Sequence, residues 1–176
     1  MTRGNNGQVL FRHDYDYERY LQVLAEAARR QQVSVYHFVL LPRYVHLLVH
    51  ALLGTSLTKM MRSVNLSYSW HYRKRYEYTG HLWQGRFQSR VLADGAAALL
   101  FGRSLELKPV YAGLAKEPSG YLWSSFRAYA EGIDGLPLST NPHYQALGES
   151  DPERQSRYRQ LSSAPELRVS TNRSAT

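Results

Sequence analysis

Basic and aromatic side chains alternate between residues 59 and 90 of this sequence. Seven Lys and Arg residues stand against one acidic residue, Glu77, so the stretch holds +6 of the formal net charge of +8. The charged groups suit contact with phosphates, and the aromatic groups between them suit stacking on unpaired bases. The stretch therefore predicts a nucleic-acid interface formed by Lys59, Arg62, Arg73, Lys74, Arg75, His81, Trp83, Gln84, Arg86 and Arg90. The alternative is a solvated helix face followed by core aromatics, but so concentrated a single-sign patch favours nucleic acid.

The composition of the whole chain favours a polyanionic partner. Lys and Arg number 22 against 14 Asp and Glu, and the pI is about 9.8. Such a balance is typical of proteins that bind nucleic acid or an acidic membrane. The sequence has no cysteine, which excludes a disulfide scaffold, a thiolate zinc site, an iron-sulfur centre and a cysteine nucleophile.

Length and hydrophobicity predict one soluble domain. A chain of 176 residues with 43% hydrophobic residues is long enough for one buried core. No window reaches the run of about 20 apolar residues that a membrane span needs, and the first residues lack the apolar core of a signal peptide. We expect a cytoplasmic protein without a membrane partner.

Hydrophobic periodicity predicts a mixed α and β chain. Apolar residues at three- and four-residue steps predict helices, and β-branched or alternating segments predict strands. The expected elements are helices over 15–32, 57–78 and 96–107, a hairpin of strands over 33–41 and 44–50, and a strand over 87–92.

Six motifs in this order resemble those of the REP-associated tyrosine transposases, relatives of the HUH-class single-strand transposases. The resemblance covers residues 2–161. Each motif is a weak pattern alone, but their order and spacing together are specific. The motifs are RGNN from Arg3, LPRYVHLLV from Leu41, GHLWQGRF from Gly80, ELKPVYAGL from Glu106, YLWSSFRAY from Tyr121 and NPHYQALG from Asn141.

The resemblance implies an α+β fold in which a ferredoxin-like antiparallel sheet carries helices on one face. It also implies a division of the chain into a transposase-like DNA-binding domain over 2–130 and a C-terminal extension of the same domain over 131–163. We expect residues 164–176 to be a disordered tail. Family members usually carry a strand ahead of the RGNN turn, and this sequence starts at that turn. Either the start is misplaced, or that strand is absent and the exposed sheet edge is covered by a partner chain, as in a homodimer.

In the family, two histidines two residues apart on a strand hold Mg²⁺ or Mn²⁺, which polarises the scissile phosphate. A tyrosine on a later helix attacks that phosphate, and a polar residue one helical turn further on completes the metal shell. This sequence departs from the pattern at three positions. Tyr44 replaces the first histidine and leaves His46 alone, Ser104 replaces the tyrosine, and Lys108 replaces the polar ligand. A lysine ammonium has no lone pair for a metal. We therefore expect no intact catalytic residue, no cofactor, and only a vestigial metal ligand at His46.

Other residues offer a rearranged site. Tyr44, His46 and His50 would share one strand face as a metal cluster, Ser104 would attack as a nucleophile, or Tyr111 would replace the lost tyrosine. Each is weaker than its structural alternative, because the phenol of tyrosine is a poor metal ligand and Ser104 lacks an activating base. The structural alternative is a hydrogen-bonded strand histidine at His46, and likewise at His37 and His50. Trp123 and Phe126 are expected in the core, with a secondary DNA contact as the alternative.

The preferred functional hypothesis is a DNA-binding protein of the transposase family that recognises REP-type hairpin or single-stranded DNA without cutting it. One alternative is an active single-strand transposase with rearranged residues, which would require Mg²⁺ or Mn²⁺. Another is a non-catalytic partner of an intact transposase, or a decayed remnant.

Overall fold

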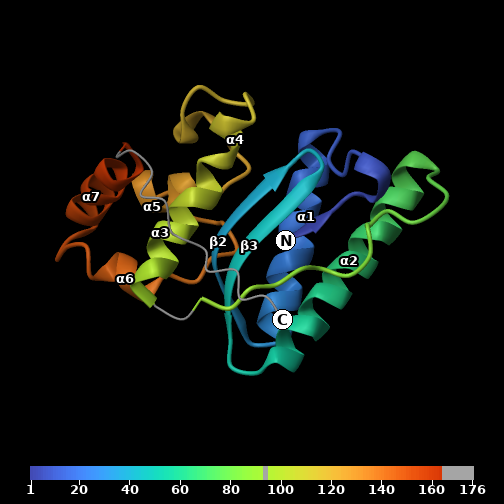
Figure 1. Ribbon diagram of the computed structural model, residues 1–176, viewed down its shortest axis with the longest axis horizontal. Helices are drawn as coiled ribbons and strands as arrows, with labels where there is room; N and C mark the ends of the chain where they lie inside the picture. The colour runs from blue at the N-terminus through green and yellow to red at the C-terminus, as the bar shows by residue number, and fades with distance from the viewer. Residues whose placement is uncertain (93–94, 164–176) are drawn as a thin grey trace, which may run out of the picture.

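The computed structural model describes residues 1–92 and 95–163. A three-stranded antiparallel sheet lies at its centre, with strands β1 (Thr2–Arg3), β2 (Val33–Leu41) and β3 (Tyr44–Ala51) in the order β1-β3-β2 (Figure 1). The hairpin of β2 and β3 is the one that the sequence predicts. Its register pairs Leu41 with Tyr44 at the turn and shifts by one residue between Val35 and His37.

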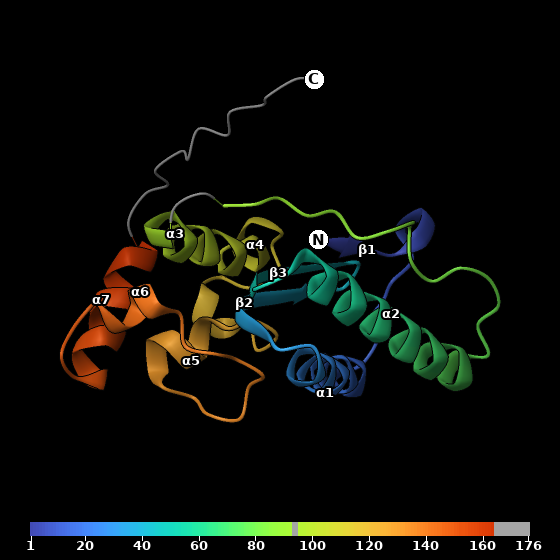
Figure 2. The same cartoon turned by 90° about the horizontal axis from the view of Figure 1, so that it is seen from below.

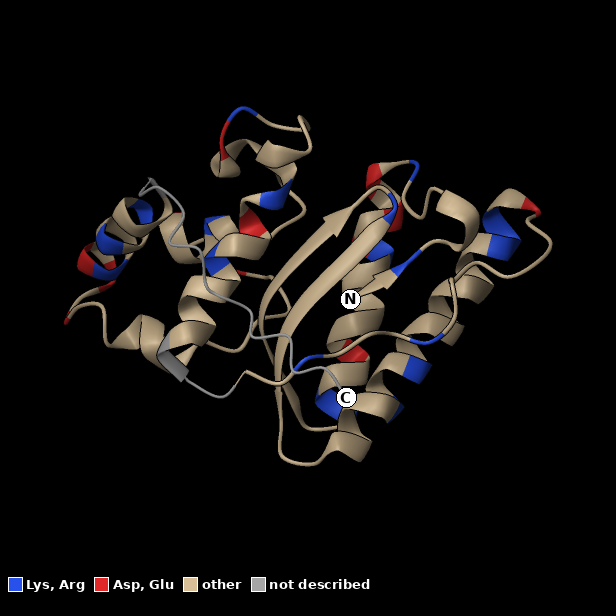
Figure 3. Cartoon of the chain, in the orientation of Figure 1, with Lys and Arg blue, Asp and Glu red and all other residues tan. Residues whose placement is uncertain are grey.

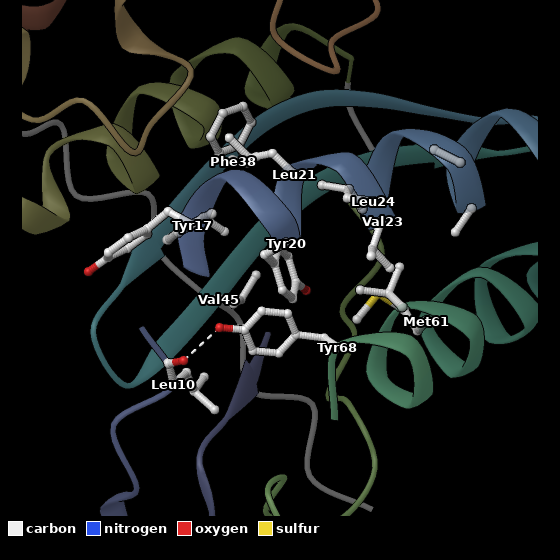
Figure 4. Close-up of a cluster of buried hydrophobic side chains, with 14 of the residues drawn as sticks. Leu10, Tyr17, Tyr20, Leu21, Val23, Leu24, Phe38, Val45, Met61 and Tyr68 are labelled. Atoms are coloured by element: carbon white, nitrogen blue, oxygen red, sulfur yellow. Dashed lines mark hydrogen bonds between the residues drawn. The ribbon is translucent and has the colours of Figure 1, made fainter. Parts of the chain in front are cut away.

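Helices α1 (Asp14–Arg30) and α2 (Gly54–Tyr76) pack side by side on one face of this sheet (Figure 2). The main core lies between them and the sheet. Tyr68 of α2 is fully buried there, and its hydroxyl donates a 2.7 Å hydrogen bond to the carbonyl of Leu10 (Figure 4). The expected α+β fold, with a ferredoxin-like antiparallel sheet and two helices on one face, is confirmed.

The opposite face of the sheet is covered by α3 (Gly95–Glu106), which the sequence predicts as a helix but does not place. Val39 and Leu41 alternate with the residues of the main core, so they point to this second face and pack with Leu105. α3 ends at Glu106, within one residue of the predicted end at 107, and the next helix contains Pro109. Pro109 occupies the second position of α4 (Lys108–Tyr111), where its missing N–H removes no hydrogen bond.

The chain continues into three further helices, α5 (Phe126–Glu131), α6 (Pro142–Gln145) and α7 (Asp151–Ser163). These helices form a second cluster of buried side chains together with α3, centred on Tyr158. Two short 3-10 turns, η1 (Asn5–Gly7) and η2 (Pro118–Gly120), complete the elements. The tail expected over 164–176 lies outside the described residues.

Both outer edges of the sheet are covered by other segments of the chain. Beyond β1, the amide of Gln84 bonds the carbonyl of Arg3 at 2.9 Å, and Gly4 forms a bridge with Trp83. Beyond β2, the amide of Leu40 bonds the carbonyl of Trp123 at 2.9 Å. The residues beside β1 take the place of the fourth strand of a ferredoxin-like sheet.

Two expectations are corrected here. Residues 87–92 do not form a strand, because the chain turns away after the bridge at Trp83 and only Gln88 pairs back: its amide donates to the carbonyl of Met1, and its carbonyl accepts a hydrogen bond from the Met1 amino terminus. The strand expected to be missing is present in short form as β1, where Thr2 pairs with Val45. Because other segments cover both edges, a homodimer is not needed to cover an open sheet edge. No helix among the described residues is long and apolar enough to cross a membrane.

Candidate nucleic-acid interface

A groove of about 910 Å³ runs between α2 and the loop that follows it. We call it the α2 groove. It brings together side chains from three parts of the chain, namely the turn after β1, the outer face of α2 and the loop over 81–87. The lining residues are Asn5, Thr58, Met61, Arg62, Asn65, Leu66, Ser69, Trp70, Arg73, His81, Leu82, Trp83, Gly85, Arg86 and Phe87.

The helical period of α2 explains which of its residues reach the groove. One face of the helix is buried in the core through Met60, Met61, Val64, Tyr68 and Tyr72, as the sequence predicts. Arg62, Asn65, Ser69 and Arg73 follow one another at steps of three and four residues, so they share a second face. Figure 3 shows Lys and Arg recurring along α2 and on the segment after it.

Hydrogen bonds to α2 hold the far wall of the groove in place. The indole Nε1 of Trp83 donates a 3.0 Å hydrogen bond to the carbonyl of Asn65, and Arg73 Nη2 donates one of 2.9 Å to the carbonyl of Gly80. The Trp83 ring also contacts the ring of Tyr68 in the core, with centroids 5.9 Å apart. The loop is therefore fastened to the helix and to the core, so that the groove is preformed.

The lining of the groove joins positive charge to aromatic surface. Arg62, Arg73 and Arg86 supply three guanidinium groups, and none of the lining residues is acidic. The Trp70 side chain is 64% exposed although it is large and apolar, and Lys74 Nζ lies 5.2 Å from the centre of its ring. Exposed aromatic rings beside arginines suit stacking on bases and contact with phosphates.

The structure brings together only half of the ten residues predicted for the interface. Arg62, Arg73, His81, Trp83 and Arg86 line the α2 groove. The side chains of Lys59, Lys74, Gln84 and Arg90 are exposed outside it. Arg75 Nε instead lies 3.7 Å from Asp16 Oδ1 on the side of α2 that faces α1.

Trp70 and Asn65 line the groove but are not among the ten predicted residues, and Asn65 gave no signal of charge or aromatic character. The side-chain oxygen Oδ1 of Asn65 is buried and has no hydrogen-bond partner among the described residues. The backbone carbonyl of Asn65 accepts the hydrogen bond from Trp83 Nε1, and the residue lines the groove. The helical spacing from Arg62 would have identified it, because residues three apart lie on one helix face.

The positions that the family resemblance assigns to catalysis gather on the other face of the sheet, towards α3 and α4. The Tyr44 side chain is 38% exposed at the start of β3, and His46 follows two residues later on the same face. The pKa of His46 is lowered to about 4, mainly by burial and in smaller part by the nearby positive charges of Lys108 and the chain's amino terminus. The imidazole is therefore neutral at pH 7.

These residues do not fit a divalent cation. The described residues contain no group of three or more His, Asp, Glu or Cys side chains placed to hold a metal. His46 has the ammonium of Lys108 nearby, which lacks a lone pair and repels cations. His50 lies four residues along the strand, about 13 Å from His46 at the usual strand rise, and its ring stacks on Tyr36 with centroids 6.1 Å apart.

The other candidates for chemistry have structural partners. Ser104 Oγ donates a 2.7 Å hydrogen bond to the carbonyl of Phe101 in its own helix. His37 is fully buried with its Nδ1 2.9 Å from Glu106 Oε1, so it is a core histidine. Trp123 and Phe126 pack in the core, and Trp123 stacks on Tyr17 with centroids 4.5 Å apart. Tyr111 lies exposed on α4.

Comparison with known proteins agrees with this architecture. One solved structure, described as a REP-associated tyrosine transposase bound to a REP hairpin, matches with a TM-score of 0.62 and 17% sequence identity. The match covers 78% of this chain and 81% of that chain, and it shows a shared fold. No curated protein matches the sequence. The family model for IS200-like transposases matches residues 2–97, more than half of the sequence, and the chain therefore belongs to the IS200-like transposase family.

Proposed function

We propose that this protein binds single-stranded or hairpin DNA in the α2 groove and does not cut it. The observation that carries the proposal is the lining of the groove, in which Arg62, Arg73 and Arg86 surround aromatic side chains with no acidic residue among them. Guanidinium groups bind phosphates in fixed geometry, and exposed indoles offer flat surfaces to bases.

The groove suits bases that are not paired within a duplex. Trp70 and Trp83 offer ring faces or edges that only an unstacked base can meet, as in loops, bulges and single strands. A REP hairpin is the ligand of the solved transposase structure with the same fold, which supports DNA of this kind as the ligand.

The absence of cutting is proposed from the side chains at the family's catalytic positions. Ser104 has its hydroxyl bonded to the carbonyl of Phe101, and no described histidine or carboxylate bonds it as a base. Lys108 stands where the family has a metal ligand. Binding DNA in the α2 groove requires none of these positions, because none of them lines the groove.

The experiment is a fluorescence anisotropy titration of labelled hairpin and single-stranded DNA at several salt concentrations. Three arginines in contact with phosphates predict a slope of log affinity against log salt of about −2 to −3. The triple variant R62A/R73A/R86A is expected to lose most of this slope. The control R29A/R30A/K116A removes the same charge from exposed positions outside the groove and is expected to keep it. Equal slopes for both variants, or no salt-dependent binding by the wild type, would contradict the proposal.

A further inference from the structure

A cluster of positive and polar groups occupies the face of the sheet that carries His46. Residues directly opposite each other in an antiparallel pair point to the same face, and Arg3 of β1 is opposite Tyr44 of β3. His46 lies two residues further along the same face, close to the ammonium of Lys108. We call Arg3, Tyr44, His46 and Lys108 the Lys108 cluster.

The two cations of the Lys108 cluster have no acidic partner among the described residues. Neither Arg3 nor Lys108 forms an ion pair with a residue in the described ranges, and Lys108 is half-buried. Glu106, the acidic residue nearest to Lys108 in sequence, bonds His37 and Tyr158 in the core instead. A partly desolvated ammonium without a counter-charge is unfavourable, and an anionic ligand would relieve it.

The neighbouring groups are hydrogen-bond donors of the kind that an oxyanion needs. The Tyr44 side chain, which carries a hydroxyl, is 38% exposed, and a neutral imidazole at His46 carries one N–H. Lys108 supplies a point charge and Arg3 a planar guanidinium, both of which bind phosphate oxygens. Together these groups match a phosphate better than they match a cation.

We propose that the Lys108 cluster binds a phosphate group in the place that the family resemblance assigns to a divalent cation. The inference deepens the proposed function, since a DNA phosphate is one source of that group. The loop over 81–87 connects the two sites. Trp83 lines the α2 groove, while the next residue, Gln84, bonds Arg3 through its amide at 2.9 Å. A DNA strand that leaves the α2 groove across this loop would therefore pass Arg3.

The test follows the ring signals of His46 in ¹H–¹⁵N NMR spectra of the full chain at fixed pH and ionic strength. Inorganic phosphate is titrated first, and a single-stranded oligonucleotide second. Phosphate is expected to shift the His46 signals saturably. Lys108→Gln is expected to weaken this binding by about tenfold, as for the loss of one charge-assisted contact. Lys108→Arg, which keeps the charge, and Lys59→Gln, which removes an exposed lysine of α2, are expected to preserve it.

The arms of the experiment separate this inference from DNA binding in the groove. In Arg73→Gln the oligonucleotide is expected to bind more weakly while inorganic phosphate still shifts His46. If inorganic phosphate shifts the His46 signals and the oligonucleotide does not, the cluster binds free phosphate, and the proposal that DNA supplies the phosphate is wrong. The absence of any phosphate effect, equal binding by Lys108→Gln, or selective broadening of His46 by Mn²⁺ ahead of exposed His81 would overturn the inference, even if the α2 groove binds DNA.

Discussion

His37 Nδ1 lies 2.9 Å from Glu106 Oε1, which joins β2 to the end of α3 inside the core. The second oxygen of Glu106 accepts a 2.6 Å hydrogen bond from the Tyr158 hydroxyl of α7. Ser125 Oγ, at the start of α5, also bonds this carboxylate. One buried side chain thus ties the sheet and α3 to the helices that follow, and it lies two residues from both Ser104 and Lys108.

Removing the Tyr158 hydroxyl is expected to loosen this junction. Tyr158→Phe leaves a buried carboxylate oxygen without its donor, so the free energy of unfolding should fall by about 1.5–3 kcal/mol. Urea unfolding measures the change. Tyr15→Phe, which removes an exposed hydroxyl without a hydrogen bond to a described residue, serves as the control and should change stability little. Equal stability of the two variants would show that Glu106 does not depend on Tyr158.

Two neighbouring core tyrosines should respond to the same substitution with opposite signs. The Tyr20 hydroxyl is buried and has no hydrogen-bond partner among the described residues, whereas that of Tyr68 bonds the carbonyl of Leu10 (Figure 4). Tyr20→Phe removes an unsatisfied polar group and should leave stability unchanged or raise it by up to about 1 kcal/mol. Tyr68→Phe should lower it by about 1–2 kcal/mol. Thermal unfolding of both variants decides the point, and a larger loss for Tyr20→Phe would show that its hydroxyl has a partner.

Asp16 should make folding stability depend on acid pH. Burial raises the pKa of this carboxyl, but hydrogen bonds from the Tyr76 hydroxyl, the amides of Arg12 and His13, and His71 outweigh it and hold the pKa below its ordinary value. A carboxyl with a depressed folded pKa stabilises the fold above its unfolded pKa, about 3.9, and this stability is lost as the pH falls through the folded pKa.

The variant Asp16→Asn is therefore expected to be less stable than the wild type at pH 7, by about 1–3 kcal/mol. The gap should narrow below about pH 4 as Asp16 becomes protonated. Asp14→Asn, at the exposed start of the same helix, is the control and should cost no more than about 1 kcal/mol through the helix dipole. Urea unfolding across this pH range measures both, and a gap that stays constant with pH would contradict the role of the Asp16 charge.

The sequence predicts α1, α2, α3 and the hairpin because each has a hydrophobic period, but it does not predict α4, α5, α6 or α7. It fails over 87–92, where alternation resembles a strand but only Gln88 pairs back, through two hydrogen bonds with Met1, since β1 is too short to pair with the segment further. The face on which α3 packs depends on long-range contacts such as that between Leu105 and Val39, which no local pattern encodes.

For the interface, charge density predicts which stretch of the sequence takes part, but not which of its side chains share one surface. Arg73, Lys74 and Arg75 are consecutive, and successive residues of a helix point about 100° apart. Only Arg73 reaches the α2 groove, while Lys74 lies over Trp70 and Arg75 faces Asp16. The catalytic positions were located through the family resemblance, and the structure adds that Lys108 lies close to His46.

The most direct test of the account incubates labelled REP-type hairpin DNA with the protein and Mn²⁺ and compares native with denaturing gels. A protein that binds DNA without cutting it is expected to give a retarded complex on the native gel, together with intact DNA and no protein-linked DNA on the denaturing gel. A covalent adduct or a nicked product on the denaturing gel, or DNA that is never retarded on the native gel, would contradict the proposed function.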